Sequence, residues 1–207
     1  MKILVTGGGG NFGKTFKKIN SNKYITPNRE ELNLSDTKSI LQFYNNNKDI
    51  DGIILGAKIN TVEVWNNSSN DLYRNFLKPE FEKSYSENIY NNFYLTELYS
   101  SKLKFIIYMT STFHYDKYFG YRVNKLAGEK FFLGLKTTDK FKHVDIKVVN
   151  PGHMDTELTY LEVCTKIDRF INDIDIDFIK NSDYFLLNNN GDDYVSYEEI
   201  KKYKTNK

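Results

Sequence analysis

The stretch MKILVTGGGGNFGKT, residues 1–15, combines a short apolar run, a glycine-rich turn and the beginning of a helix. Backbone N–H groups in such a turn, directed from a helix N-terminus, form a binding site for a phosphate group. Read from Gly8, the turn follows the pattern G-x-x-x-x-G-K-T and ends at Gly13, Lys14 and Thr15. That pattern is typical of the P-loop that binds nucleoside triphosphates.

The same turn also fits a second pattern. Read from Thr6, it is T-G-x-x-G-x-x-G, with spaced glycines at Gly7, Gly10 and Gly13, which is typical of a turn that binds a dinucleotide. Four consecutive glycines satisfy either pattern, so the turn alone leaves ATP and NAD(P) both open. The remainder of the chain has to distinguish them.

Length and composition predict a single soluble domain, residues 1–207, because 40% of the residues are hydrophobic and 27% are charged. The net charge of +2 gives no indication of a nucleic-acid or membrane partner. Cys164 is the only cysteine, so no internal disulfide can form. The apolar run in MKILV is too short for a secretory signal, and no apolar stretch approaches the roughly 20 residues that cross a bilayer. We therefore expect a cytoplasmic protein.

Apolar segments with strand character alternate with helical segments along the chain. Strands are expected at 3–5, 23–26, 32–34, 52–57, 104–112 and 145–150, with a final strand entering a tight turn in 184–197; helices are expected at 11–20, 35–44, 79–101 and 121–135. Ser35 is the expected N-cap of its helix. This alternation predicts a doubly wound α/β fold, in which helices cover both faces of a parallel sheet. A short segment around 157–182 is expected to cover the substrate.

Tyr121 and Lys125 form the pattern Tyr-x-x-x-Lys within a segment expected to be helical. Residues four apart lie on one face of a helix, and a neighbouring ammonium lowers the pKa of a phenol from about 10 towards working pH. Such a pair can serve as a general acid and base. By itself the pair is weak evidence and is better explained as a solvated helix face, because the chain has 16 tyrosines and chance pairs with lysine are common.

Further polar residues follow the expected strands, at the edge where a doubly wound sheet binds its ligand. They are Thr110, Ser111 and Thr112 after one strand, and Pro151, Gly152 and Thr156 after the next. Asn88 lies in the helical segment that precedes both strands. Together with the glycine turn and the Tyr-x-x-x-Lys pair, these residues form an ordered series of motifs.

That order resembles the short-chain dehydrogenase/reductase family, and the resemblance extends from Met1 to about Leu158. It implies an NAD(P)-dependent oxidoreductase that interconverts a carbonyl and an alcohol by hydride transfer. Tyr121 would exchange the proton with the substrate, and Lys125 would lower the pKa of that tyrosine and bind the nicotinamide ribose. Ser111 would orient the carbonyl, with Thr110 or Thr112 as alternatives because its separation from Tyr121 is short. Asn88 would support a water-mediated proton relay.

The resemblance also implies a cofactor site, with NADP slightly preferred over NAD because Arg29 follows the second strand and can meet a 2′-phosphate. The implied cofactor-binding residues are Thr6, Gly7, Gly10, Asn11, Phe12, Gly13, Arg29, Asn33, Leu34, Ala57, Tyr121, Lys125, Pro151, Gly152 and Thr156. The chain departs from the family at Leu55-Gly56-Ala57-Lys58, which retains only Ala57 of Asn-Asn-Ala-Gly. It departs again at Asn33, where the family has an Asp.

Several alternatives remain open. A P-loop NTPase usually has an acidic residue at the end of another strand to hold Mg²⁺, and none of the expected strands ends in one. An EF-hand-like loop is spaced along 188–199, but Asp193 stands where a glycine is required. We therefore predict no metal site. A non-catalytic NAD(P)-binding regulator and a sugar-nucleotide reductase or epimerase of the family's extended branch also fit the fold.

The partners that we expect are a compact carbonyl or alcohol substrate and a second copy of the chain in a homodimer. The substrate pocket would be bordered by Ser111, His114, Tyr121 and the segment after Thr156. Neither nucleic acid nor membrane is expected as a partner.

Overall fold

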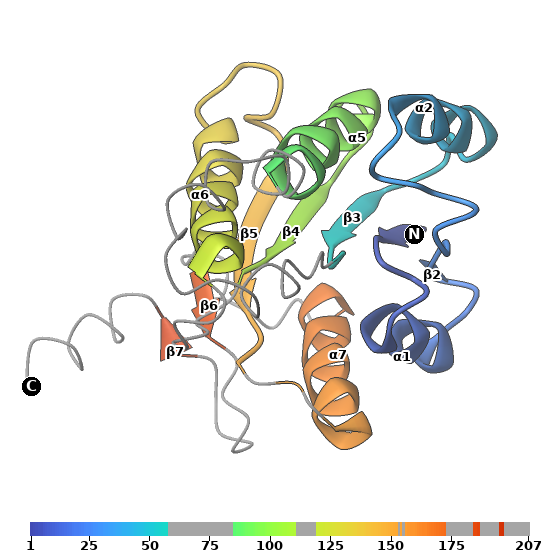
Figure 1. The fold of residues 1–207 in the computed structure, drawn as a ribbon, viewed down its shortest axis with the longest axis vertical. Helices are drawn as coiled ribbons and strands as arrows, with labels where there is room; N and C mark the ends of the chain where they lie inside the picture. Colours follow the sequence, from blue (N-terminus) through green and yellow to red (C-terminus); the bar gives the residue numbers. More distant parts are fainter. Residues whose placement is uncertain are drawn as a thin grey trace, which may run out of the picture.

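The computed structural model describes residues 1–57, 85–110, 119–152, 154, 156–172, 184–186 and 195–196. Its centre is one sheet with the strand order β2-β1-β3-β4-β5-β6-β7 (Figure 1). The strands are β1 (Ile3–Val5), β2 (Tyr24–Ile25), β3 (Gly52–Leu55), β4 (Phe105–Met109), β5 (Asp145–Asn150), β6 (Tyr184–Leu186) and β7 (Val195–Ser196). From β2 to β6 all neighbouring strands run parallel, and β7 pairs antiparallel with β6.

The described helices are α1 (Asn11–Ile19), α2 (Thr37–Asn46), the π-helical turn η2 (Ser86–Tyr90), α5 (Asn91–Tyr99), α6 (Phe119–Leu135) and α7 (Glu157–Asn172). They form two layers, with α2, α5 and α6 on one face of the sheet and α1 and α7 side by side on the other (Figure 1). None of these helices is long and apolar enough to cross a membrane.

Each central strand contributes alternate side chains to two separate cores, because successive residues of a strand point to opposite faces. In β4, Ile106 and Tyr108 pack beneath α2, α5 and α6, whereas Ile107 and Met109 pack beneath α1 and α7. Both faces of the sheet are therefore buried. The predicted doubly wound α/β fold is confirmed, and the antiparallel edge strand β7 is an addition that the sequence did not predict.

The sequence prediction was wrong at residues 32–34, which are not a strand. The side chain of Asn28 accepts hydrogen bonds from the N–H groups of Glu30 (2.8 Å) and Glu31 (3.0 Å), and the Leu32 N–H bonds back to the Asn28 carbonyl at 2.9 Å. These local bonds turn the backbone and compete with strand pairing. Leu32 is nevertheless buried in the core, which explains the apolar signal.

The start of α2 also differs from the expected one. Asp36 is the N-cap, with its carboxylate accepting from the Lys38 N–H at 2.9 Å. Ser35, the predicted cap, instead donates its hydroxyl hydrogen bond to Glu87. Of the helix predicted over 79–101, the described part begins as the π-helical turn η2 and continues as α5 to Tyr99.

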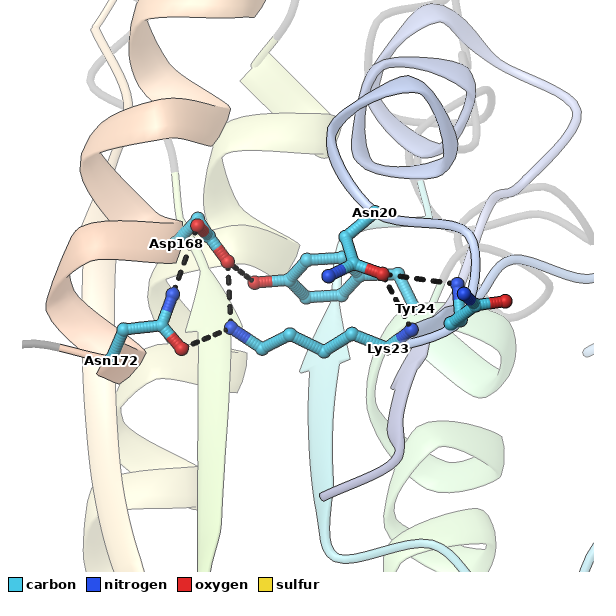
Figure 2. A network of polar contacts seen from close by, with 6 residues as sticks. Asn20, Lys23, Tyr24, Asp168 and Asn172 are labelled. Atoms are coloured by element: carbon cyan, nitrogen blue, oxygen red, sulfur yellow. Dashed lines mark hydrogen bonds and ion pairs between the residues drawn. The ribbon is translucent and has the colours of Figure 1, made fainter.

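A polar network fastens α7 to β2 (Figure 2). Lys23 Nζ lies 2.6 Å from Asp168 Oδ1 and 2.7 Å from Asn172 Oδ1, and the Tyr24 hydroxyl donates to the same oxygen of Asp168. Burial alone would raise the pKa of Asp168, but the hydrogen bonds from Lys23 and Tyr24 outweigh it and hold that pKa below its ordinary value. Burial, followed by the bond to Asp168, raises the pKa of Tyr24.

Candidate functional site

A cleft of about 650 Å³ opens at the carboxyl edge of the sheet. It lies where β1 has β2 on one side and β3 on the other, so the chain leaves the sheet in opposite directions. Ligands of doubly wound folds bind at this kind of switch point. The cleft is lined by Gly7, Gly8, Gly9, Gly10, Asn11, Phe12, Pro27, Asn28, Arg29, Leu32, Asn33, Leu34, Ser35, Gly56, Ala57, Glu87, Met109, Thr110, Lys125, Pro151, Gly152, Met154 and Tyr160.

The glycine turn between β1 and α1 forms one wall of this cleft. Gly7 has a positive φ of 82°, which disfavours any other residue. A Cβ on Gly13 would lie 2.3 Å from the Gly8 Cα, and one on Gly8 would lie 2.2 Å from the Thr26 carbonyl oxygen. A Cβ on Gly9 would meet nothing within 4 Å. The turn therefore packs tightly on its protein side and leaves open space on the cleft side.

The N-terminus of α1 fits an anion. No side chain caps this helix at Gly10, and its first turn contains no acidic residue. The N–H groups there are thus available to a negatively charged group, which the helix dipole also favours. The open face beside Gly9 gives a pyrophosphate the room to approach them.

The structure distinguishes the two patterns that fit the glycine turn, the P-loop and the dinucleotide-binding turn. A P-loop needs its lysine beside the phosphates and its threonine hydroxyl on Mg²⁺, but Lys14 is exposed and does not line the cleft. The Thr15 hydroxyl donates to the Asn11 carbonyl at 2.8 Å, inside the helix. The geometry thus fits the dinucleotide pattern and not the P-loop.

A buried lysine on α6 also lines the cleft. Lys125 is 3% exposed, and its Nζ donates to the Met109 carbonyl oxygen at 2.9 Å and lies 5.1 Å from the centre of the Tyr108 ring. Tyr121 belongs to the same helix, one turn earlier, but its side chain lies outside the described residues. The helix predicted for this pair is confirmed, and four-residue spacing puts both on one face.

Hydroxyl groups follow β4 as predicted, but only one of them is described. Thr110 is buried and lines the cleft, and its hydroxyl lies 3.3 Å from Glu129 Oε2. That contact makes Thr110 a poorer candidate for orienting a carbonyl. Ser111 and Thr112 lie outside the described residues, as does His114, so their roles stay predictions.

Asn88 lies within η2 and is buried, but it is not among the residues that line the cleft. The widened turn around it is stabilised by Asn92, whose Nδ2 donates to the carbonyls of Glu87 (3.1 Å) and Asn88 (2.9 Å). Single π-helical turns occur frequently at functional sites. The turn therefore marks the segment that the sequence singled out, although the relay itself stays a prediction.

The residues predicted at the adenosine end lie together in the cleft. Arg29 is exposed, with Nη2 lying 3.4 Å from the Ser35 hydroxyl oxygen. The Asn33 side chain accepts from the Ser35 N–H at 3.0 Å, and the Leu34 carbonyl accepts from Asn91 Nδ2 at 2.6 Å. Arg29, Asn33, Leu34 and Ala57 all line the cleft.

Pro151 and Gly152 line the cleft after β5, as predicted. Gly152 has a positive φ of 71°, and its N–H donates to Asn150 Oδ1 at 3.1 Å. Thr156 does not line the cleft: its hydroxyl oxygen accepts from the Thr159 N–H at 3.2 Å, at the beginning of α7. In this structure Thr156 therefore serves the helix start.

Two other predicted cofactor residues act behind the cleft. Thr6 is fully buried, and its hydroxyl oxygen accepts from the Ala57 N–H at 3.0 Å, which joins the ends of β1 and β3. Gly13 is buried against Gly8. Neither lines the cleft, so each shapes the turn from within.

Sequence reasoning missed several cleft residues, above all Ser35, Glu87, Met154 and Tyr160. Glu87 directly precedes Asn88, so its position beside a named motif was the available signal. Tyr160 places the beginning of the segment expected to cover the substrate at the cleft, with Met154 just before that segment, but the body of α7 packs beside α1.

The EF-hand-like alternative falls mostly outside the described residues. Tyr184–Leu186, which should be helical before such a loop, is the strand β6, and Val195–Ser196 pairs with it antiparallel. This agrees with a strand and turn. In the described ranges, no group of three or more His, Cys, Asp or Glu residues is placed to hold a metal ion.

No protein-family model matches the chain, and no curated protein matches its sequence. Solved structures do match it. A short-chain dehydrogenase from Burkholderia cenocepacia in complex with NADP gives a TM-score of 0.71 at 14% identity, covering 99% of this chain and 94% of that chain. An alcohol dehydrogenase from the archaeon Thermococcus sibiricus, complexed with 5-hydroxy-NADP, gives 0.66 at 14% identity, covering 93% and 98%.

A metagenomic short-chain oxidoreductase in complex with NADP gives a TM-score of 0.63 at 12% identity, covering 86% of this chain and 94% of that chain. At such low identity the likeness concerns the fold. The chain therefore has the Rossmann fold of the short-chain dehydrogenase/reductases.

Proposed function

We propose that this protein is an NAD(P)-dependent oxidoreductase that interconverts a carbonyl and an alcohol. The observation that carries the proposal is one shared cleft, which is lined both by Lys125 of α6 and by the glycine turn before α1. A site for a pyrophosphate and a buried ammonium one helical turn from a tyrosine are the parts that such chemistry needs. The solved structures with this fold that contain NADP support the same choice of cofactor.

Residues at different positions in the cleft would bind different parts of the cofactor or take part in the proton transfer. The glycine turn and the beginning of α1 would hold the pyrophosphate, and Lys125 would contact the nicotinamide ribose. The nicotinamide ring, when bound, supplies the hydride donor or acceptor. Tyr121 would give a proton to the carbonyl oxygen during reduction or remove one from the alcohol during oxidation.

Lys125 would make that proton transfer possible at neutral pH. An ammonium near a phenol favours the phenolate and so lowers the tyrosine pKa. Its burial strengthens the effect, because the interaction is less screened than at the surface. Ser111 would hold the carbonyl oxygen, and Asn88 would connect Lys125 to water.

Binding is tested first, by titrating the protein with NADPH, NADH and ATP–Mg²⁺ and following tyrosine or nicotinamide fluorescence. We expect micromolar binding of a nicotinamide dinucleotide. Binding of ATP–Mg²⁺ alone would overturn the proposal. A panel of small aldehydes and ketones, together with UDP- and dTDP-sugars, then identifies the substrate by NAD(P)H absorbance.

Turnover is tested with Tyr121→Phe, for which Tyr90→Phe is the matched control because Tyr90 is 58% exposed. Loss of the proton donor should lower kcat by about 10²–10⁴-fold with cofactor affinity almost unchanged. The control should keep wild-type kcat. A Tyr121→Phe variant with more than about a tenth of wild-type activity would remove Tyr121 from this role, and dinucleotide binding without any turnover would indicate a regulator.

A further inference from the structure

One end of the cleft contains a buried carboxylate. Glu87 of η2 is 5% exposed, and among the described residues that line the cleft it is the only acidic one. The Ser35 hydroxyl donates a hydrogen bond to its Oε1. Within the described ranges, no hydrogen bond to its Oε2 is found. The second oxygen is thus available to a donor in the cleft.

Burial of a carboxylate is costly unless hydrogen-bond donors or a cation compensate for the lost water. Ser35 supplies one neutral donor. Arg29 contacts the hydroxyl of Ser35 and not Glu87 itself, and its Nη2 is 3.4 Å from that oxygen. A ligand that brings a second donor to Glu87 would therefore gain a charge-assisted hydrogen bond, which is stronger than a neutral one.

The surroundings of Glu87 suit a flat ring. Leu32 and Leu34 line the same cleft, and the Leu34 carbonyl is bonded to Asn91, the first residue of α5, at 2.6 Å. That bond holds the apolar loop against the segment that carries Glu87. Asn33 also lines the cleft, but it is neutral and its Oδ1 already accepts from the Ser35 N–H.

We propose that Glu87 recognises the exocyclic amino group of the adenine ring in the bound dinucleotide. This rests on the proposed function, since it requires the phosphates to lie at the glycine turn of the same cleft. The apolar side chains would cover the ring, Ser35 would fix the carboxylate, and Oε2 would accept the amino hydrogen. Glu87 would thereby supply the negative acceptor that Asn33 lacks.

The test compares binding of NADH with binding of deamino-NADH, in which hypoxanthine replaces adenine. This exchange puts a carbonyl oxygen where adenine has its amino group, so an acceptor would face the carboxylate. We expect the wild-type protein to bind NADH at least about tenfold more tightly, since a buried charged group without its partner is penalised. Titration calorimetry measures both dissociation constants without relying on activity.

Two variants assign the preference to this residue. Glu87→Gln should bind the two dinucleotides with nearly equal affinity, because the new amide can donate to the hypoxanthine oxygen. Ser35→Ala, at an exposed position, should reduce the preference in part by releasing the carboxylate. Glu97→Gln on α5 is the matched control: its side chain is 38% exposed and bonds to Lys140, away from the cleft, so the preference should persist.

The outcomes separate the two proposals. Failure to bind NADH, deamino-NADH and NADPH alike would refute the proposed function. Equal wild-type affinities for NADH and deamino-NADH would refute the role of Glu87 while leaving that function intact, and this result requires no variant. A wild-type preference that survives in a folded Glu87→Gln protein would refute it as well, and should Glu87→Gln not fold, so would a preference of undiminished size in Ser35→Ala.

Discussion

Gly8 and Gly9 are neighbours in one turn, yet the structure predicts opposite effects when each is replaced by alanine. A Cβ on Gly8 would lie 2.2 Å from the Thr26 carbonyl oxygen and 2.5 Å from that of Pro27. Both are backbone atoms, so the loop after β2 would have to move by about 1 Å to reach ordinary contact. A Cβ on Gly9 has no neighbour within 4 Å.

The magnitude follows from these contacts. Overpacking typically costs about 1–3 kcal/mol, and displacement of the loop would also weaken the 3.1 Å hydrogen bond from the Gly8 N–H to the Pro27 carbonyl, worth about 1 kcal/mol. We expect Gly8→Ala to lower the free energy of unfolding by about 2–4 kcal/mol. Gly9 has no positive φ, so Gly9→Ala should be neutral or stabilise by up to about 0.5 kcal/mol, because alanine restricts the unfolded chain.

Urea unfolding followed by far-ultraviolet circular dichroism measures this difference. The midpoint should fall for Gly8→Ala at an unchanged slope m, and should stay or rise for Gly9→Ala. Since Gly9 lines the cleft, Gly9→Ala should also weaken dinucleotide binding without loss of stability. Equal stability of the two variants, or a less stable Gly9→Ala, would show that the turn does not pack against the loop after β2 in this way.

Three further predictions concern charged side chains. Asp168→Asn should lower the free energy of unfolding by about 1–3 kcal/mol at neutral pH. Because the pKa of Asp168 is depressed in the folded state, wild type should keep its full stability advantage over the variant above the ordinary Asp pKa of about 3.9 and lose it as the pH falls through the lower folded pKa. Urea titrations from pH 7 to pH 2.5 measure this. Arg29→Ala should weaken NADPH binding more than NADH binding, because the guanidinium would contact the 2′-phosphate, which only NADPH carries. An unchanged ratio of the NADPH and NADH dissociation constants would exclude that contact. Lys14→Ala should leave dinucleotide affinity nearly unchanged in the same titrations, because Lys14 does not line the cleft, and a marked loss would revive the P-loop reading.

The central strands were predictable because burial on both faces requires continuous apolar runs. The residues of β3, Gly52–Leu55, are all buried, and the predicted strand at 145–150 coincides with β5. The edges of the sheet were less predictable. Residues 32–34 carry an apolar pattern that burial of Leu32 explains without any strand pairing, and the direction of β7 depends on pairing partners that a local pattern does not contain.

Some residues of the candidate site could likewise be predicted from the sequence and others could not. Gly7, Gly10, Arg29, Lys125 and Gly152 were predicted, and all of them line the cleft. Glu87 was missed because an acidic residue in a predicted helix ordinarily lies in solvent. Its burial depends on the Ser35 loop, which is 52 residues away in the chain. Contacts over such separations are decided by the tertiary fold and leave no periodicity in the sequence.

The choice between the two glycine patterns illustrates which information the sequence did hold. Phe12 and Phe16 are four residues apart and both are buried in the core beneath α1, with Ile19 packed beside them. A helix with this apolar face directs a residue two positions after Phe12 to the other side, because successive residues are about 100° apart. Lys14 is that residue, and it is exposed. The amphipathic pattern of α1 therefore already disfavoured a phosphate-binding lysine. The glycines themselves fit both patterns and could not distinguish them.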